Sequence, residues 1–447
     1  MKRYEKYKEV DLHWLKEVPE GWEIGELGFA FAERRSKVTD KEYLPLSVTK
    51  KGILPQLTNV AKTDNGDNRK KVLKGDFVIN SRSDRKGSSG ISEYDGSVSL
   101  INTVLTIRKG YKYYWHYLLR SIPFQEEFYR HGKGIVADLW STNFQSMKKI
   151  ILPIPPLSEQ EKIANYLDWK INDIDRLIQI EKDKIKELKR LMLNSTAEFV
   201  LKGINTLKFK KSSIKWIDNI PSHWDEISIR GCVDIIRGNS SFTKDDLKNY
   251  GEYVGLQYGK VYKTEIIDSK FNFYVSEKFY KTSQVVNRND IILVSTSETV
   301  EDLGHTSFYD RNDIGLIGGE QILLRPNNID AKYLFYLSKV FRHQLQLCAT
   351  GIKVYRFKIN DLKHLYIPLP PIEEQEIIVS NIESKLKQLD EGVKNCYDLI
   401  KELELLKQSL ISEVVTGKID VRNIVIPEYE KVTVSDYEAE EIGETER

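Results

Sequence analysis

A loop rich in arginine, asparagine and serine carries the side chains best suited to chemistry on a ligand. Residues 80–90 read Asn-Ser-Arg-Ser-Asp-Arg-Lys-Gly-Ser-Ser-Gly and directly follow the apolar run 76–80. Arginine can form two hydrogen bonds with guanine and asparagine can do the same with adenine, whereas serine and lysine hold phosphates. This composition therefore suits contact with DNA, although a single loop of this kind is more often a plain surface turn.

A second polar loop, 295–299, reads Ser-Thr-Ser-Glu-Thr and follows the apolar run 290–294. Its Glu298, if it faces DNA, would accept a hydrogen bond from cytosine rather than contact phosphate. The two loops and the basic or polar clusters around them supply our candidate DNA-binding residues. They are Arg34, Arg35, Lys37, Arg69, Lys70, Asn80, Ser81, Arg82, Ser83, Arg85, Lys86 and Ser88, followed by Arg237, Asn239, Ser240, Gln257, Tyr258, Lys260, Ser295, Thr296 and Ser297.

Signatures of catalysis are missing from the sequence. There is no GxxxxGK[ST] phosphate-binding loop, and the seven histidines are scattered without the spacing of metal ligands. Three widely separated cysteines form neither a zinc cluster nor a disulfide framework. A nuclease-like Glu187-Leu188-Lys189 lies in mid-helix beside an apolar stripe, which is typical of a solvated ion pair. We expect a protein with no catalytic residues, no metal and no cofactor of its own.

The charges are unevenly placed along a nearly neutral chain. The 447 residues carry 68 Lys and Arg against 66 Asp and Glu, and 40% are hydrophobic, which is enough to build folded cores. Residues 1–157 hold 27 basic and 19 acidic side chains, whereas residues 421–447 hold three and eight. A basic first lobe favours phosphate contact, although such a lobe is often only a solvated surface.

The elements that position these loops are repeated along the chain. Trp14, Pro19 and Trp22 recur as Trp216, Pro221 and Trp224, each 202 residues later. The segment 152–161, Leu-Pro-Ile-Pro-Pro-Leu-Ser-Glu-Gln-Glu, recurs as Ile-Pro-Leu-Pro-Pro-Ile-Glu-Glu-Gln-Glu at 367–376, 215 residues later. Two motifs that are repeated in the same order indicate an internal duplication.

A long amphipathic helix follows each proline run. Apolar residues recur at steps of three, four or seven after Ser158 and after Glu373, and glycines end both patterns at Gly203 and Gly417. A helix with one apolar stripe needs a partner. We expect the two helices to form an antiparallel coiled coil with a lobe at each end, while the alternative is that each helix packs on its own lobe.

Each lobe has mixed character, with the shared order strand, polar loop, strand, helix. The first has strands at 76–80 and 97–107 and a helix around 115–119, and the second has the runs 290–294, 321–324 and 333–337. The predicted class is α+β, with two similar α/β target-recognition domains separated by the coiled coil in a pseudo-twofold repeat. The predicted boundaries are 1–157, first domain; 158–203, first helix; 204–213, linker; 214–372, second domain; 373–418, second helix; and 419–447, acidic tail.

These motifs, Trp-x(4)-Pro-x-x-Trp and Pro-x-Pro-Pro-[Leu/Ile]-x-Glu-Gln-Glu, each present twice, resemble the specificity (S) subunit of type I restriction-modification systems, the HsdS family. The resemblance implies that each domain reads one half of an asymmetric bipartite DNA site and that the helices fix the gap. It implies two docked methyltransferase (M) subunits, which carry S-adenosylmethionine, and motor-endonuclease (R) subunits. It also suggests that Glu159, Gln160, Glu374 and Gln375 dock partners.

Two features depart from this family pattern, and one rival interpretation remains. The acidic tail has no counterpart in the motifs, and Glu373 replaces the serine cap. Without an apolar leader at the N-terminus or a run of 18 apolar residues, we expect a cytoplasmic protein. The alternative is a coiled-coil scaffold whose lobes bind protein, and the salt dependence of DNA binding would separate the two.

Overall fold

Two long helices run through a computed structural model that describes residues 2–56, 66–82, 85–134 and 140–431. They are α5 (Leu157–Lys202), with 46 residues, and α9 (Ile372–Val415), with 44 residues. The predicted ranges, 158–203 and 373–418, agree closely with these bounds. The chain divides into two compact units, Met1–Lys182 with Tyr397–Arg447, and Asp183–Cys396, so each long helix begins in one unit and ends in the other.

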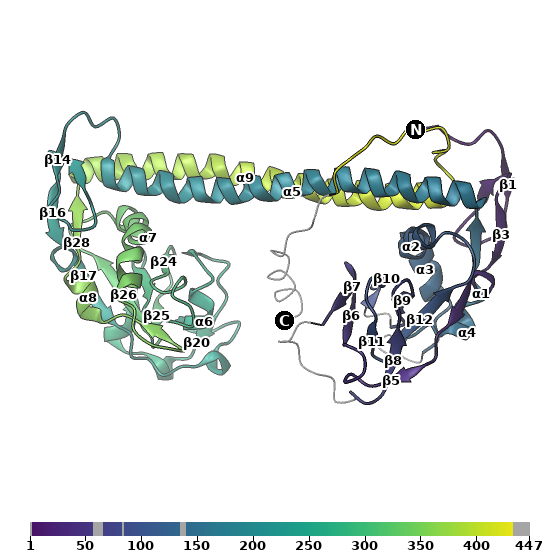
Figure 1. Ribbon diagram of the computed structural model, residues 1–447. Helices are drawn as coiled ribbons and strands as arrows, with labels where there is room; N and C mark the ends of the chain where they lie inside the picture. Colours follow the sequence, from purple (N-terminus) through teal and green to yellow (C-terminus); the bar gives the residue numbers. More distant parts are fainter. Residues whose placement is uncertain (1, 57–65, 83–84, 135–139, 432–447) are drawn as a thin grey trace. The chain divides into compact units, whose positions relative to one another are not determined.

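The first unit is built on an antiparallel sheet in the order β10-β9-β12-β4 (Figure 1). These strands are β10 (Ser89–Ile91), β9 (Phe77–Asn80), β12 (Asn102–Ile107) and β4 (Phe31–Glu33). The apolar residues of β9 and the start of β12 are buried, and the helices α2 (Lys112–Arg120) and α3 (Ile122–Arg130) contribute aromatic residues to the same core.

Smaller elements complete the first unit. A three-stranded sheet has the order β11 (Gly96–Val98), β8 (Arg69–Val72) and β5 (Lys37–Val38). The single strand predicted over 97–107 is therefore wrong, because a turn at 99–101 divides it into β11 and β12. The described part of this unit also contains β1 (Tyr7–Glu9), β2 (Glu17–Pro19), β3 (Glu23–Glu26), α1 (Leu27–Ala30), β6 (Leu46–Thr49), β7 (Gly52–Pro55), α4 (Phe144–Met147) and β13 (Ile151–Ile154).

The second unit has a five-stranded sheet in the order β17-β26-β22-β24-β19. These strands are β17 (Val233–Arg237), β26 (Gln321–Pro326), β22 (Ile291–Val294), β24 (Thr306–Tyr309) and β19 (Ile266–Ile267), and α7 (Ala331–Leu347) packs against them. The other elements are β14 (Phe209–Lys211), β15 (Asn219–Pro221), β16 (Asp225–Ser228), β18 (Tyr253–Leu256), α6 (Tyr258–Val261), β20 (Tyr274–Val275), β21 (Val285–Val286), β23 (Thr296–Ser297), β25 (Gly315–Ile317), β27 (Tyr355–Arg356), α8 (Ile359–Lys363) and β28 (Tyr366–Leu369), with short 3-10 turns at Ile229–Gly231, Lys244–Asp246, Glu277–Phe279 and Thr282–Gln284.

The central strands of the two units pair in the same register. In the first unit Asn80 lies opposite Asn102, and in the second Val294 lies opposite Gln321. Each residue of β9 therefore has its equivalent in β22, 214 residues later, and each residue of β12 has its equivalent in β26, 219 residues later. The predicted duplication is confirmed at the level of strand pairing.

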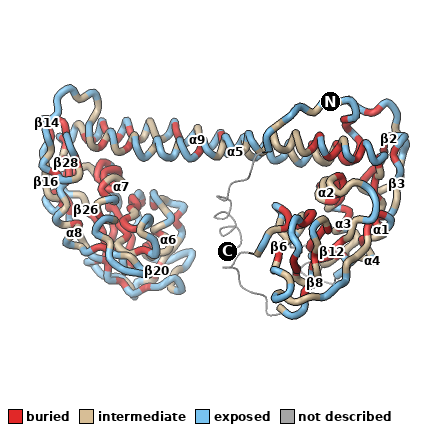
Figure 2. The backbone as a smooth tube through the Cα atoms, in the orientation of Figure 1, coloured by how far each residue is buried: buried red, intermediate tan, exposed pale blue. Residues whose placement is uncertain are grey.

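The long helices pair antiparallel within each unit. In the first unit, Leu167 near the start of α5 shares a core with Leu410 near the end of α9, and Lys407 Nζ lies 2.6 Å from Asp175 Oδ1. In the second unit, Val200 near the end of α5 shares a core with Ile378 near the start of α9. Both cores also contain residues of the sheets, so the helix ends pack on the lobes as well as on each other (Figure 2).

Two predicted boundaries need correction. The linker 204–213 contains β14, which pairs with β15. The predicted tail 419–447 begins inside the first unit, since Ile419 and Val421 are buried and the Asp420 N–H donates to the Lys2 carbonyl at 2.9 Å. Residues 432–447 lie outside the described part of the chain. Within the described residues, no helix is both long and apolar enough to cross a bilayer.

Candidate nucleic-acid interface

The glutamate and glutamine of the first repeated motif hold the start of α5 to the rest of the first unit. Glu159 Oε1 accepts hydrogen bonds from Trp22 Nε1 at 3.0 Å and from the Tyr4 hydroxyl at short range. Burial, together with this bond, raises the pKa of Tyr4. Gln160 Oε1 accepts from the Tyr111 N–H at 2.8 Å, and its Nε2 donates to the Pro155 carbonyl at 2.8 Å.

The second motif makes the same contacts. Glu374 Oε2 accepts from Trp224 Nε1 at 3.0 Å. Gln375 Oε1 accepts from the Asp330 N–H at 2.7 Å, and Gln375 Nε2 donates to the Pro370 carbonyl at 2.8 Å. In each unit, the second tryptophan of the repeated motif thus donates to the glutamate of the Glu-Gln pair.

These contacts argue against partner docking by the two glutamines, whereas docking by Glu159 and Glu374 stays a prediction. Gln160 and Gln375 are only 3% and 1% exposed, so neither offers a surface to another protein. Glu159 is 9% exposed, and Glu374 is half-buried with one carboxylate oxygen already occupied. All four side chains stabilise their own unit.

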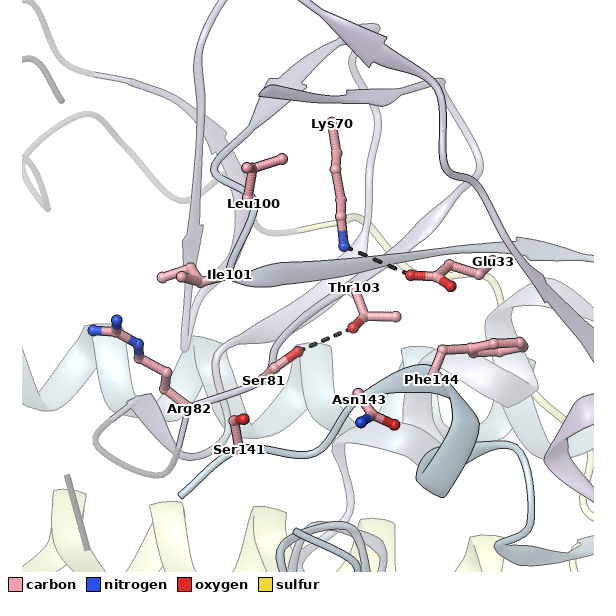
Figure 3. A pocket seen from close by; sticks show the side chains of 10 residues that line it. All are labelled: Glu33, Lys70, Ser81, Arg82, Leu100, Ile101, Thr103, Ser141, Asn143 and Phe144. Carbon is pink, nitrogen blue, oxygen red and sulfur yellow. Dashed lines mark hydrogen bonds and ion pairs between the residues drawn. The ribbon is translucent and has the colours of Figure 1, made fainter. Parts of the chain in front are cut away.

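In the first unit, the predicted polar loop meets the turn that precedes β12. The Ser81 N–H donates to the Ile101 carbonyl at 3.3 Å, and the Ser81 and Thr103 hydroxyls lie 3.0 Å apart. Beside this contact is a cavity of about 350 Å³ (Figure 3). Its lining residues are Glu33, Lys70, Ser81, Arg82, Leu100, Ile101, Thr103, Ser141, Asn143 and Phe144.

The second unit repeats this loop-to-turn contact with different side chains. The Ser295 N–H donates to the Glu320 carbonyl at 3.2 Å, and Ser295 Oγ donates to the same oxygen at 2.9 Å. The Thr296 hydroxyl donates to the Glu320 carboxylate. Part of the predicted loop is the short strand β23, which pairs with β27.

The candidate DNA-binding residues fall into distinct groups by exposure. The exposed group is Arg35, Lys37, Arg82, Arg85, Arg237 and Asn239. The half-buried group is Arg34, Lys70, Lys86, Gln257, Tyr258, Lys260, Ser295 and Thr296. The buried group is Arg69, Asn80, Ser81, Ser88, Ser240 and Ser297. Ser83 lies outside the described residues. The exposed group therefore offers the most side-chain surface to DNA, although Arg35 in it also pairs with Glu33 at 2.8 Å.

Two of the predicted arginines have structural roles instead. Arg69 is 4% exposed, and it donates from Nε to Ser97 Oγ at 2.8 Å and from Nη2 to the Ser97 carbonyl at 3.0 Å. Burial lowers the pKa of Arg69. Arg34 forms a two-pronged ion pair with buried Asp76, at 2.6 and 2.9 Å. Guanidinium groups that are engaged in this way are poorly placed to reach a base.

The second unit contains an equivalent ion pair between an arginine and a buried aspartate. Asp290 stands before β22 as Asp76 stands before β9, and it pairs with Arg325 of β26 at 3.1 and 2.7 Å. Each aspartate also accepts from the backbone N–H three residues earlier, at Leu73 and at Asn287. The buried aspartate occupies the same place in both repeats, whereas its arginine follows β4 in the first unit and lies on β26 in the second.

Buried Asn80 shapes the first loop through its side chain. Asn80 Oδ1 accepts from the Arg82 N–H at 3.0 Å and so fixes the first residue of the loop that is exposed. In the second unit, Tyr258 stacks on Tyr262 with ring centres 5.7 Å apart, and Lys260 Nζ lies 4.5 Å from the centre of the Phe273 ring. Burial raises the pKa of Tyr258. In the described part of the chain, no group of three or more His, Cys, Asp or Glu side chains could hold a metal.

Comparisons with known proteins agree with this architecture. A family model described as "Type I restriction modification DNA specificity domain" matches residues 19–190 and 221–404. A Methanocaldococcus jannaschii protein assigned as the MjaX specificity subunit of a type I restriction enzyme is 26% identical over 443 residues, which cover 91% of this chain and 96% of that protein. The MjaVIII specificity subunit of the same organism is 24% identical over 449 residues, covering 95% and 99%.

A solved structure shares the fold. A chain from a structural study of complex assembly and conformational transition of the type I R-M system matches with a TM-score of 0.65 at 16% identity, and the match covers 90% of this chain and 99% of that one.

Proposed function

Because this chain belongs to the family of type I restriction-modification DNA specificity domain proteins, we propose that it is the DNA specificity subunit of a type I complex and that each of its units reads one half of a bipartite site. The supporting observation is the shared strand register combined with different side chains on the equivalent loops. Arg82 follows β9, whereas Thr296 holds the equivalent position after β22. Equal scaffolds with unequal surfaces favour a target whose two halves differ.

The exposed basic residues of the first unit supply affinity for phosphates. Arg35, Lys37, Arg82 and Arg85 are exposed, and residues 1–157 carry a basic excess. Lysine and arginine that neutralise phosphates release counterions, so DNA affinity falls steeply with salt. A scaffold that binds only protein would not show this dependence on a DNA ligand.

The long helices fix the gap between the half-sites in this proposal. Each helix begins in one unit and ends in the other, and an α-helix rises about 1.5 Å per residue. A spacer of fixed length selects a fixed number of base pairs between the halves, as it does for dimers with separated half-sites.

The catalytic steps belong to partner subunits in this proposal. Two methyltransferase subunits would carry S-adenosylmethionine, and motor-endonuclease subunits would complete the complex. Large apolar side chains remain exposed on the helices, among them Leu193 of α5 at 63% and Leu405 of α9 at 57%. Such side chains offer docking sites for helices of the methyltransferase subunits, in place of the buried glutamines of the Glu-Gln pairs.

The test is to map methylated bases in DNA from cells that express the chain with its methyltransferase subunits. We expect a two-part motif with unequal halves and a fixed gap. Arg82→Ala should relax one half-site and leave the other unchanged, whereas Arg190→Ala, which alters an exposed arginine of α5 paired with Glu187, should change neither. Equal relaxation of both halves by Arg82→Ala would contradict reading by separate units.

A further inference from the structure

The turn before β12 and the turn before β26 occupy the same place in the two units. Asn102 and Gln321, which begin these strands, lie at equivalent positions of the same register. The carbonyl just before each strand accepts the N–H of the equivalent serine, Ser81 at 3.3 Å and Ser295 at 3.2 Å. The turns 99–101 and 318–320 are therefore structural equivalents, with Ile101 matched to Glu320.

The two turns present opposite chemistry. In the first unit, Leu100 and Ile101 are 40% and 37% exposed and line the 350 Å³ cavity together with Arg82 (Figure 3). In the second, the exposed side chain is the Glu320 carboxylate, which accepts from the Thr296 hydroxyl and forms no ion pair with a described residue. One hydroxyl occupies one of about four lone-pair positions on a carboxylate, so acceptor capacity remains.

The backbone at Glu320 is held in an unfavourable conformation. Its φ is 62°, in the left-handed region where side chains with a Cβ are disfavoured. Two hydrogen bonds from Ser295 to the Glu320 carbonyl hold the backbone in this conformation. The turn is also tight at Gly318, because a Cβ there would lie 2.7 Å from the Leu256 carbonyl oxygen. A glycine would satisfy the backbone at 320 without strain, so the presence of glutamate indicates a use for its side chain.

The amides that hold the two turns are incompletely satisfied. Asn102 Nδ2 donates to the Ser99 carbonyl at 3.1 Å, and Gln321 Oε1 accepts from the Gly318 N–H at 3.1 Å. These side chains are 5% and 0% exposed, yet Asn102 Oδ1 and Gln321 Nε2 find no hydrogen-bond partner among the described residues. Buried polar atoms without partners are rare and costly, and water or a ligand commonly completes them. Both turns are therefore kept at a cost to stability, which is typical of functional sites.

We propose that the turns 99–101 and 318–320 are base-reading elements, with Glu320 selecting an exocyclic amino group and the Leu100–Ile101 pair selecting the methyl group of thymine. This inference rests on the proposed DNA-reading function and identifies residues that determine specificity. A carboxylate accepts from the amino group of cytosine or adenine in the major groove, and apolar side chains contact the thymine methyl. Without such an amino donor, the Glu320 carboxylate would lose its water and face only other acceptors, so the wrong base is penalised.

The variant Glu320→Gln tests the second unit in the full chain with its methyltransferase subunits, read out by the methylated motif. We expect discrimination at one base position of one half-site to fall roughly tenfold, while every other position keeps its preference. The matched control is Glu252→Gln, which alters an exposed glutamate of the same unit outside the turn and should leave the motif unchanged.

A second variant separates reading from folding. Glu320→Gly removes the carboxylate and the left-handed strain together, so it should raise the melting temperature of the chain while losing the same discrimination. If Glu320 were only structural, the motif would survive this change and the inference would be overturned.

The first unit provides the complementary test. Ile101→Ala should weaken the preference for thymine at one position of the other half-site. A wild-type motif in both Ile101→Ala and Glu320→Gln would overturn the inference, while leaving the proposed function standing. A wild-type complex that methylates without any sequence motif would instead refute the proposed function itself.

Discussion

Replacing Gln160 with alanine should destabilise the first unit while leaving sequence reading intact. The side chain is 3% exposed and joins the Tyr111 N–H to the Pro155 carbonyl, with both hydrogen bonds at 2.8 Å. Tyr111 is the N-cap residue of α2, and Pro155 lies just before α5. One amide thus connects the starts of two helices.

The magnitude follows from what the substitution leaves behind. Each of the two hydrogen bonds contributes about 1 kcal/mol net, and a buried backbone group left without a partner costs about 1–3 kcal/mol. We therefore expect Gln160→Ala to lower the free energy of unfolding by about 2–4 kcal/mol. Gln375→Ala should have a similar effect in the second unit, because Gln375 makes the equivalent bonds to Asp330 and Pro370.

Urea unfolding of the full chain, followed by intrinsic tryptophan fluorescence, would measure these changes. Gln408→Ala is the matched control, since Gln408 is exposed on α9 and its loss should change stability by less than about 0.5 kcal/mol. The reasoning is refuted if Gln160→Ala unfolds like the wild type but no longer binds methyltransferase subunits. That result would restore the motif as a docking surface.

Other changes should have equally distinct outcomes. Inserting one helical turn near both Ile185 and Ile400 should lengthen the gap in the methylated motif and leave the bases of each half unchanged. Arg69→Ala should lower stability by about 2 kcal/mol or more, because Arg69 donates to Ser97 from a buried position, and a motif altered without a loss of stability would argue against this role. Burial, together with a neighbouring arginine, lowers the pKa of His116 from 6.5 to about 3, so the unfolded chain takes up a proton that the folded chain does not. The stability of the first unit should therefore decrease as the pH falls from 6.5 towards 3, and urea midpoints at pH 7 and pH 5 should show a smaller difference in His116→Asn.

The sequence predicted those features that repeat with a period. The apolar stripes predicted α5 and α9 to within a few residues. The repeated tryptophan and proline motifs predicted the duplication of the lobes. Hydrophobic periodicity is a strong signal over such lengths. The turn at 99–101 was missed because Ser97–Ile107 is rich in β-forming residues throughout, and only tertiary pairing divides it into β11 and β12.

Burial was the part of the site that residue type could not predict. Arg69 and Arg82 look alike in the sequence, yet one is 4% exposed on a strand and the other is exposed beside a cavity. The buried Asp76, which lies far from Arg34 in the sequence, is what identifies that arginine as structural. Glu320 was not recognised because the sequence does not show that it lies beside the loop 295–299, which it meets only through the pairing of β22 with β26.

The residues that repeat build the cores, whereas those that differ between the units form the loop surfaces. This difference decides which segment can be replaced by the equivalent segment of a relative. The second core includes Val200 of α5 and Ile382 of α9 in addition to the sheet, so an exchange limited to 214–372 would cut through packed side chains. An exchange of Asp183–Cys396 would keep that core whole and carry the 318–320 turn with it. Large-to-small and shape changes in a core cost about 1–5 kcal/mol each. The exchange of Asp183–Cys396 should therefore fold and change one half of the target sequence. The exchange of 214–372 should lose stability before it reveals any change in specificity.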